Sequence, residues 1–359
     1  MLNNTLKMAL DQNTFPQAVL LTGERGVGKI RMACELAMAL MCTNSNVQSE
    51  PCGFCFHCKS WNPDSGQNPW LWLLPRKQKS SDESTSESES ETESEKIQAL
   101  AANPWSDSHI SAEAFISVGD VRALIRHLGS KETHARVVIV PEVDRMNVQA
   151  ANAFLKTLEE VPANTYFILT SSRPTALLPT ILSRALRVAI PPYSENDFKR
   201  VLRNISTKLN SSALEEESFL YALSGGSVSR ALNWIENNSS ESCEGVLSFL
   251  GAAGGGVYAY VAFVQEFGVP EKKDEASQFL ETLYLIWGDI GRVYSGIELR
   301  LPMREKIVNL AQFWNDADRY AIIAERILET RRQIAANTTP QMALNALGYF
   351  LCLAAKKNY

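Results

Sequence analysis

The stretch AVLLTGERGVGKIRMACELA, residues 18–37, decides the fold of this chain. An apolar run typical of a buried strand leads into a glycine-rich loop and then into a helical pattern. The loop follows the phosphate-binding pattern GxxxxGK(S/T), and the residues expected to face a phosphate are Gly23, Gly26, Gly28 and Lys29. The last position departs from the pattern, because Ile30 stands where a hydroxyl would hold Mg²⁺.

Further short apolar runs, at residues 70–74, 137–140, 166–170 and 186–190, alternate with helical patterns such as 118–129 and 148–160. This alternation predicts an α/β P-loop domain with a parallel five-stranded sheet covered on both faces. Pro191 and Pro192 end the alternation, since two prolines continue neither a strand nor a helix. Beyond them only helical patterns remain, the longest at residues 276–297, 304–331 and 339–355. We therefore expect three domains, at residues 1–192, 193–240 and 241–359.

Composition indicates a globular protein, with 45% apolar and 21% charged residues among 359. The sequence has no apolar run long enough to span a bilayer, so we expect no membrane segment and a cytoplasmic protein. The net charge of −5 comes from the Ser/Glu-rich run at residues 80–96, which alone carries −6. We expect a disordered acidic insertion over residues 79–100. The near-neutral remainder gives no broad basic surface for nucleic acid.

Four cysteines predict a structural zinc site over residues 42–58: Cys42, Cys52, Cys55 and Cys58. Two overlapping CxxC steps and a fourth thiol can surround a metal tetrahedrally, and Gly53 permits the tight turn between them. A site that uses His57, or four free thiols, are the alternatives. The remaining cysteines stand in apolar helical patterns and are expected in the core: Cys34, Cys243 and Cys352.

A second magnesium ligand is expected at the end of the strand in VVIVPEVDRMN, residues 137–147. Pro141 occupies the position of the first carboxylate, while Glu142 and Asp144 follow it. Together with Ile30, two positions that should orient Mg²⁺ are thus inert. Because Mg²⁺ neutralises the phosphates in such reactions, we expect no ATP hydrolysis by this chain alone, and whether ATP binds at all stays open.

The segment HARVVIVPEVDRMNVQAANAFLKTLEEVPANTYFILTSSRPTALLPTILSRALRV, residues 134–188, resembles the AAA+ clamp-loader subunits of bacterial DNA polymerase III, and among them the delta-prime type. Four features agree in order: the phosphate loop, the four-cysteine insertion, NAFLKTLEE and LLPTILSR. The resemblance is strong over residues 1–235, and ANTTPQMALNAL near the C-terminus is similar to the last collar helix of these proteins. It implies a helical lid domain at 193–240 and a collar domain for oligomerisation at 241–359.

The resemblance also implies roles for single residues. Arg184 takes the position of an arginine finger that acts in trans on ATP held by a neighbouring subunit, and Glu142 that of a vestigial base. Ser171 and Ser172 fall near the sensor-1 position. In the sensor-2 region GGSVSRAL, Ser229 replaces the arginine of the ATPase subunits and Arg230 follows it. The implied partners are other clamp-loader subunits in a hetero-oligomeric ring, a sliding clamp, and primed DNA reached through the complex.

Two other functions are considered. A catalytically active ATPase of the gamma/tau type would hydrolyse ATP itself, with Glu142 as its base. A zinc-containing DNA-binding module acting alone is weakened by the near-neutral body and by the lack of a basic stretch interleaved with aromatic residues. ATP turnover by the purified chain distinguishes the first alternative from the non-hydrolysing subunit.

Overall fold

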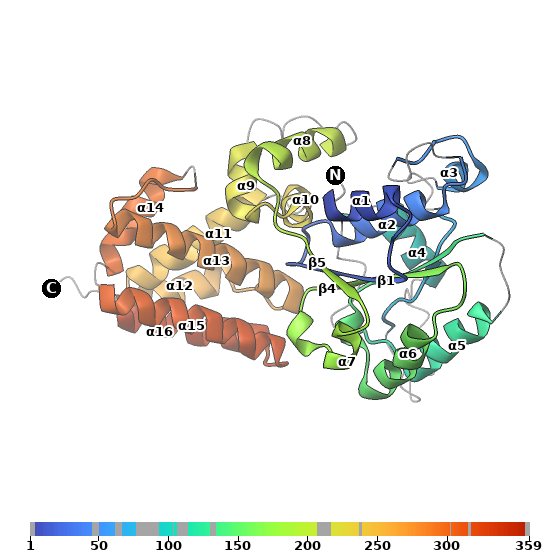
Figure 1. The fold of residues 1–359 in the computed structure, drawn as a ribbon. Helices are drawn as coiled ribbons and strands as arrows, with labels where there is room; N and C mark the ends of the chain where they lie inside the picture. Colours follow the sequence, from blue (N-terminus) through green and yellow to red (C-terminus); the bar gives the residue numbers. More distant parts are fainter. Residues whose placement is uncertain are drawn as a thin grey trace. The chain divides into compact units, whose positions relative to one another are not determined.

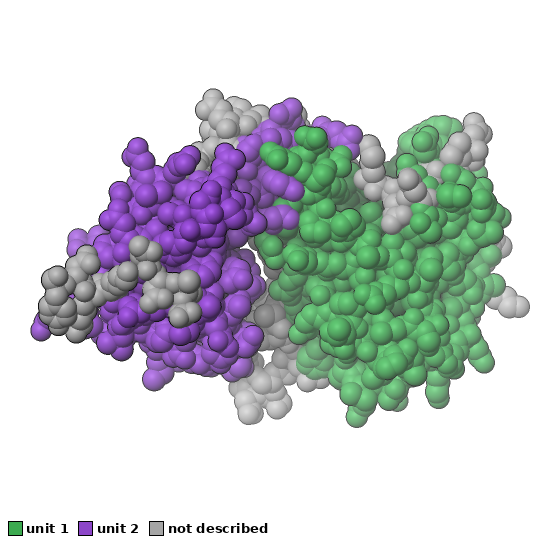
Figure 2. All heavy atoms as spheres, turned by 60° about the vertical axis from the view of Figure 1, so that its left-hand side comes forward, with its two compact units in different colours: residues 1–198, 226–230 green, residues 199–225, 231–359 purple. Residues whose placement is uncertain are grey.

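The computed structural model describes residues 4–44, 50–61, 67–76, 93–102, 104–105, 114–129, 134–206, 217–236, 239–301, 303–314 and 317–355. The chain forms two compact units, coloured separately in Figure 2. The first contains residues 1–198 and 226–230, and the second contains residues 199–225 and 231–359. The predicted separation of 193–240 from 241–359 stays a prediction.

A five-stranded parallel sheet forms the centre of the first unit, in the order β2-β3-β4-β1-β5. Its strands are β1 (Ala18–Thr22), β2 (Leu71–Trp72), β3 (Arg136–Val140), β4 (Thr165–Ser171) and β5 (Leu186–Ala189). The predicted parallel sheet is confirmed. The edge strand β2 is shorter than its apolar run at residues 70–74, because Pro75 follows it and it has one neighbour to pair with.

Helices cover both faces of this sheet (Figure 1). On one face lie α1 (Asn4–Asp11), α2 (Lys29–Met41) and α4 (Glu93–Ala102), which pack on side chains such as Val19 and Leu21 of β1. On the other lie α5 (Val118–Leu128), α6 (Val148–Glu159) and α7 (Pro179–Leu182), which pack on the alternate side chains Ala18 and Leu20. Successive strand residues point to opposite faces, so burial on both sides explains the continuous apolar runs.

Helix α4 corrects part of the expected acidic insertion. Residues 77–92 lie outside the described residues, but the chain is helical from Glu93, inside the range 79–100 that was expected to be disordered. The reason is an apolar pair, Leu100 and Ala101, which is fully buried and gives this end of the run something to pack.

The helices that follow the sheet are α8 (Glu195–Ser206), α9 (Glu217–Ser224) and α10 (Val228–Glu236). The second unit continues with α11 (Ser239–Gly254), α12 (Val257–Phe267), α13 (Lys273–Tyr294), α14 (Arg304–Ala311), α15 (Ala317–Ala335) and α16 (Pro340–Ala354). The pattern at 304–331 is thus two helices, with a short 3-10 turn at Gln312–Trp314 after the first. No strand occurs among the described residues beyond Ala189.

The core of the second unit is built around large aromatic side chains. Three of them are at most 1% exposed: Trp287, Trp314 and Tyr260. Helices α12 and α16 approach closely at Gly348, where an added Cβ would lie 2.0 Å from the Tyr260 ring. Within the described parts of the chain, no helix combines the length and the apolar character that crossing a bilayer requires.

Candidate functional site

The glycine loop connects β1 to α2 as the sequence predicts. Gly26 and Gly28 have φ angles of +76° and +85°, in the left-handed region where a side chain is strained. Lys29 begins α2 and is 5% exposed. Its Nζ donates hydrogen bonds to the carbonyl oxygens of Gly23 at 3.0 Å and Glu24 at 2.6 Å. The lysine expected to reach a phosphate is therefore bound to its own loop.

The tip of this loop is covered by the segment before and at the start of α10, which belongs to the same unit. The Ser229 backbone N–H donates to the Gly26 carbonyl at 3.3 Å, and the Ser227 hydroxyl donates to the Arg25 carbonyl at 3.3 Å. A Cβ on Gly26 would lie 2.3 Å from Ser227 Oγ. Ser229, in the predicted sensor-2 region, is 4% exposed and thus contacts the loop backbone instead of facing solvent.

An aromatic pair covers the base of the loop. A Cβ on Gly28 would lie 2.9 Å from the Trp105 ring and 3.5 Å from the Tyr193 hydroxyl. The Arg31 guanidinium stacks on Trp105, 4.4 Å from the ring centroid. Trp105 is 5% exposed, and burial raises the pKa of Tyr193. Sequence reasoning did not find Trp105, because an isolated tryptophan between an acidic run and the next helix follows no pattern.

Ile30 packs into the apolar core beneath the sheet and is 4% exposed. It shares this cluster with Ala33, Cys34, Ala37 and Met41, the helical stripe visible in the sequence. The side chain at the magnesium position therefore contributes to folding and offers no oxygen.

Glu142, the predicted vestigial base, follows β3 with a φ of +46° and is 6% exposed. Its carboxylate accepts a hydrogen bond from Arg25 Nη2 at 3.2 Å and forms an ion pair with Arg145 Nε. Arg145 is itself buried, and this burial lowers the pKa of its guanidinium against the opposing effect of Glu142. Arg25 belongs to the glycine loop. The carboxylate expected to act as a base is thus paired with two guanidinium groups.

Asp144 is also committed. Its carboxylate accepts from the Ser171 hydroxyl at 2.7 Å and from Arg173 Nε at 3.1 Å. Ser171 ends β4, and its hydroxyl accepts from the Arg173 backbone N–H at 3.1 Å. The hydroxyl of the second predicted sensor residue, Ser172, is buried and has no partner among the described residues. The structure therefore joins Ser171 to the end of β3 and leaves Ser172 outside that network.

Arg184 comes two residues after α7, a helix on the sheet face opposite to α2 (Figure 1). Its guanidinium pairs with Glu159 Oε1 at 2.5 Å and donates to the Thr180 carbonyl at 3.1 Å. The Arg184 side chain is 33% exposed and that of Glu159 is 49% exposed. The structure thus does not bring Arg184 to the glycine loop of its own chain.

The four predicted metal ligands meet in space. The sulfur atoms of Cys42, Cys52, Cys55 and Cys58 all lie within 4.8 Å of one another. The Cys52 and Cys58 sulfurs are 3.9 Å apart. A tetrahedral zinc with bonds of about 2.3 Å would separate its sulfurs by about 3.8 Å, so the set fits a closed four-thiolate site. Gly53 has a φ of +76°, which confirms the predicted turn.

The surroundings of the thiols favour ionisation of at least one of them. Burial opposes ionisation of Cys55, but hydrogen bonds from the backbone N–H groups of Cys58 and Thr43 lower its pKa to about 5. His57 lies beside the cluster, with its ring against Phe56 and His134. The buried Nδ1 of His57 has no hydrogen-bond partner within the described ranges. The group of side chains close enough to share a metal ion, however, consists of the four cysteines and does not include His57.

Comparisons with known proteins agree in matching this chain to DNA polymerase III subunits. The family described as "DNA polymerase III, delta subunit" matches residues 1–194. The DNA polymerase III subunit delta' of Bacillus subtilis is 23% identical over 340 residues, which cover 93% of this chain and 90% of that protein. The DNA polymerase III subunit tau of the same organism is 30% identical over 200 residues, covering 56% of this chain and 28% of that protein.

Among solved structures, a DNA polymerase III gamma subunit-related protein of Thermotoga maritima aligns over 98% of both chains, with 17% identity and a TM-score of 0.49.

Proposed function

This chain belongs to the DNA polymerase III delta subunit family, and on that premise we propose that it is a clamp-loader subunit of the delta-prime type, which hydrolyses no ATP itself and donates Arg184 to a neighbouring ATPase subunit. The observation that carries the proposal is that the carboxylate of Glu142 is already paired with two arginines. Arg25 and Arg145 both bind its carboxylate, so a water molecule would have to compete with two guanidinium groups for the carboxylate expected to act as base.

The magnesium positions support the same conclusion. Ile30 is part of the core and Pro141 carries no oxygen on its side chain. Without Mg²⁺, the charge that develops on a transferred phosphoryl group lacks its main counterion. Arg25 lies near Glu142, where its fixed positive charge opposes the entry of a divalent cation.

Contacts around the glycine loop also oppose nucleotide binding. Lys29 is bound to loop carbonyls, Ser229 donates to Gly26, and Trp105 lies against Gly28. A phosphate would have to displace several of these contacts at once. We propose that the loop is retained as a scaffold that holds α2, Trp105 and the start of α10 together.

The finger role of Arg184 rests on its position and on how weakly it is held. Its ion pair with Glu159 is exposed on both sides, and such pairs contribute about 0–1 kcal/mol. Exchange of Glu159 for a phosphate on another subunit therefore costs little. A guanidinium that reaches a transferring phosphoryl group accelerates the reaction by about 10³–10⁵-fold. This gain is far larger than the free energy lost when the ion pair with Glu159 breaks.

We further propose that the cysteine cluster holds a structural Zn²⁺, because four thiolates leave no open coordination position for a substrate. The ATP and Mg²⁺ would be supplied by partner subunits. Residues 193–240 would form the lid and 241–359 the collar through which the ring assembles, and the assembled ring would open a sliding clamp and load it onto primed DNA.

The alternative is an active gamma/tau-type ATPase, which the similarity to the tau subunit favours. ATP turnover by the purified chain with Mg²⁺ separates the two. We expect turnover indistinguishable from that of the Lys29→Ala variant, since neither protein can assemble Mg²⁺ and a free base. Turnover above background that disappears in Lys29→Ala would establish the alternative and would mean that Glu142 leaves its two arginines when ATP binds.

A further inference from the structure

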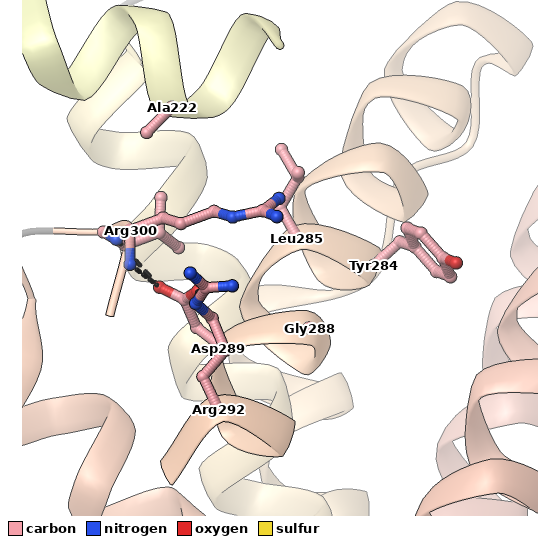
Figure 3. A pocket seen from close by; sticks show the side chains of 8 residues that line it. Ala222, Tyr284, Leu285, Gly288, Asp289, Arg292 and Arg300 are labelled. Carbon is pink, nitrogen blue, oxygen red and sulfur yellow. Dashed lines mark hydrogen bonds and ion pairs between the residues drawn. The ribbon is translucent and has the colours of Figure 1, made fainter. Parts of the chain in front are cut away.

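A hollow of about 120 Å³ lies wholly within the second unit, whereas the glycine loop and the cysteine cluster belong to the first. Helix α9 contributes Ala222, helix α13 contributes most of the wall, and the segment that precedes α14 closes it (Figure 3). The residues that line it are Ala222, Tyr284, Leu285, Gly288, Asp289, Arg292, Arg300 and Leu301. No role in the proposed clamp-loader function uses any of them.

Two guanidinium groups reach this hollow with unused donors. Arg292 Nε donates to the Glu298 carbonyl at 2.8 Å, and no partner of its two terminal nitrogens occurs among the described residues. The Arg300 guanidinium likewise has no hydrogen bond or ion pair within the described parts of the chain, and Figure 3 shows its side chain extending across the hollow towards Leu285. Each guanidinium presents a pair of parallel N–H groups, the geometry that binds an oxyanion at two points.

The single carboxylate in the lining does not neutralise these arginines. Asp289 is 1% exposed, and its Oδ2 accepts the backbone N–H groups of Arg300 at 3.0 Å and Leu301 at 2.8 Å. Arg292 Nε is 3.9 Å from its other oxygen, Oδ1. Asp289 therefore holds the segment that carries Arg300 in place, and one net positive charge remains for a ligand.

Apart from Tyr284, the rest of the lining is apolar and leaves room. Gly288 contributes no side chain, and a Cβ built there would meet nothing within 4 Å. Leu285, Leu301 and Ala222 give the walls an apolar character. A ligand that fits must thus carry an anionic group beside an apolar one.

We propose that this hollow binds a carboxylate of an acidic peptide segment on a partner protein, with an apolar side chain of the same segment against Leu285 and Leu301. Nucleic acid fits less well, because its affinity comes from several phosphates neutralised along a basic track. Here the lining offers two arginines beside the buried carboxylate of Asp289 and no continuous basic track. The proposal does not depend on ATP hydrolysis or on the role of Arg184.

The test uses the full chain and a fluorescein-labelled hexapeptide of alternating leucine and glutamate, followed by fluorescence anisotropy. We expect saturable binding that Arg300→Gln and Arg292→Gln each weaken about tenfold, since each removes a charged hydrogen bond worth about 1.5 kcal/mol. Gly288→Leu fills the hollow without changing any charge and should abolish binding. Arg304→Gln, which removes the same charge from an exposed site outside the lining, is the matched control and should bind as the unaltered chain does.

Any of the following results would overturn the proposal. One is the absence of saturable binding to the unaltered chain. Another is equal affinity for the same peptide with glutamine in place of glutamate, or an equal loss in Arg304→Gln. The last is binding of a labelled single-stranded oligonucleotide that Arg300→Gln abolishes, which would reassign the hollow to nucleic acid. Arg300 is exposed, so Arg300→Gln leaves the fold intact, and thermal melting of the Gly288→Leu variant separates blocked binding from unfolding.

Discussion

Replacement of Ile30 by threonine tests whether the position of the missing magnesium hydroxyl faces the core or an open cation site. Ile30 is 4% exposed within the cluster beneath the sheet. Ile30→Val removes one methylene equivalent from this cluster and should cost about 1 kcal/mol of unfolding free energy. Ile30→Thr has nearly the shape of the valine variant but also buries a hydroxyl, which costs about 1–3 kcal/mol more when it finds only part of its hydrogen bonds.

The assay is chemical denaturation followed by tryptophan fluorescence, with the two variants and the unaltered chain measured side by side. We expect Ile30→Thr to unfold at lower denaturant than Ile30→Val, and to remain without ATP turnover because Glu142 is still held by Arg25 and Arg145. Equal stability of the two variants would refute the reasoning, since it would mean that the hydroxyl is solvated. ATP turnover restored by Ile30→Thr alone would refute the assigned inertness of Glu142.

Three further predictions concern metal, packing and pH. The purified chain should carry one zinc per molecule by elemental analysis. Removal of the metal should lower the melting temperature, because the four cysteines lose the ion that holds them together. Absence of metal with four freely titratable thiols would contradict this prediction. Gly348→Ala should destabilise by about 1–3 kcal/mol in thermal melting, because its Cβ would meet the buried Tyr260 ring at 2.0 Å, whereas Gly288→Ala in the open part of α13 should be neutral or stabilising. The side-chain hydrogen bonds from Arg203 lower the pKa of Glu217. This carboxylate therefore stabilises the fold above its ordinary pKa of 4.5, and the contribution is lost as the pH falls through the lowered value. Glu217→Gln should narrow the difference between the melting temperatures at pH 7 and pH 3, and an unchanged difference would show that the pair contributes nothing.

The sheet could be predicted because strands that are buried on both faces are largely apolar, as residues 18–21 of β1 and 137–140 of β3 are. The cysteine cluster could be predicted because the spacing of its members in the chain limits how far apart their sulfurs can lie. The edge strand β2 and the start of α4 were harder to predict from the sequence. The length of β2 depends on pairing with a single neighbour, and α4 depends on the burial of Leu100 and Ala101 near its C-terminal end.

The contacts around the glycine loop were harder to predict. The pairing of Glu142 with Arg145 has a local signal, three residues apart in the chain, but the pairing with Arg25 arises only because the ends of β1 and β3 reach the same edge of the sheet. Trp105 and Ser229 contact the loop from segments that are distant in the chain, and no sequence pattern at either residue predicts this contact. Tertiary contacts of this kind follow from the assembled fold and not from periodicity.

The central claim is that this subunit supplies an arginine to a neighbour and performs no hydrolysis of its own. Its most direct test is clamp-stimulated ATPase and clamp loading by the reconstituted complex that contains Arg184→Ala, with Lys29→Ala and Glu159→Gln in the same subunit as controls. We predict an assembled Arg184→Ala complex with partial loss of ATPase and a larger loss of loading, while both controls retain activity, because only the neighbour's ATP loses a charge partner. Unchanged loading by a fully assembled Arg184→Ala complex, or an equal loss in Lys29→Ala, would contradict the account.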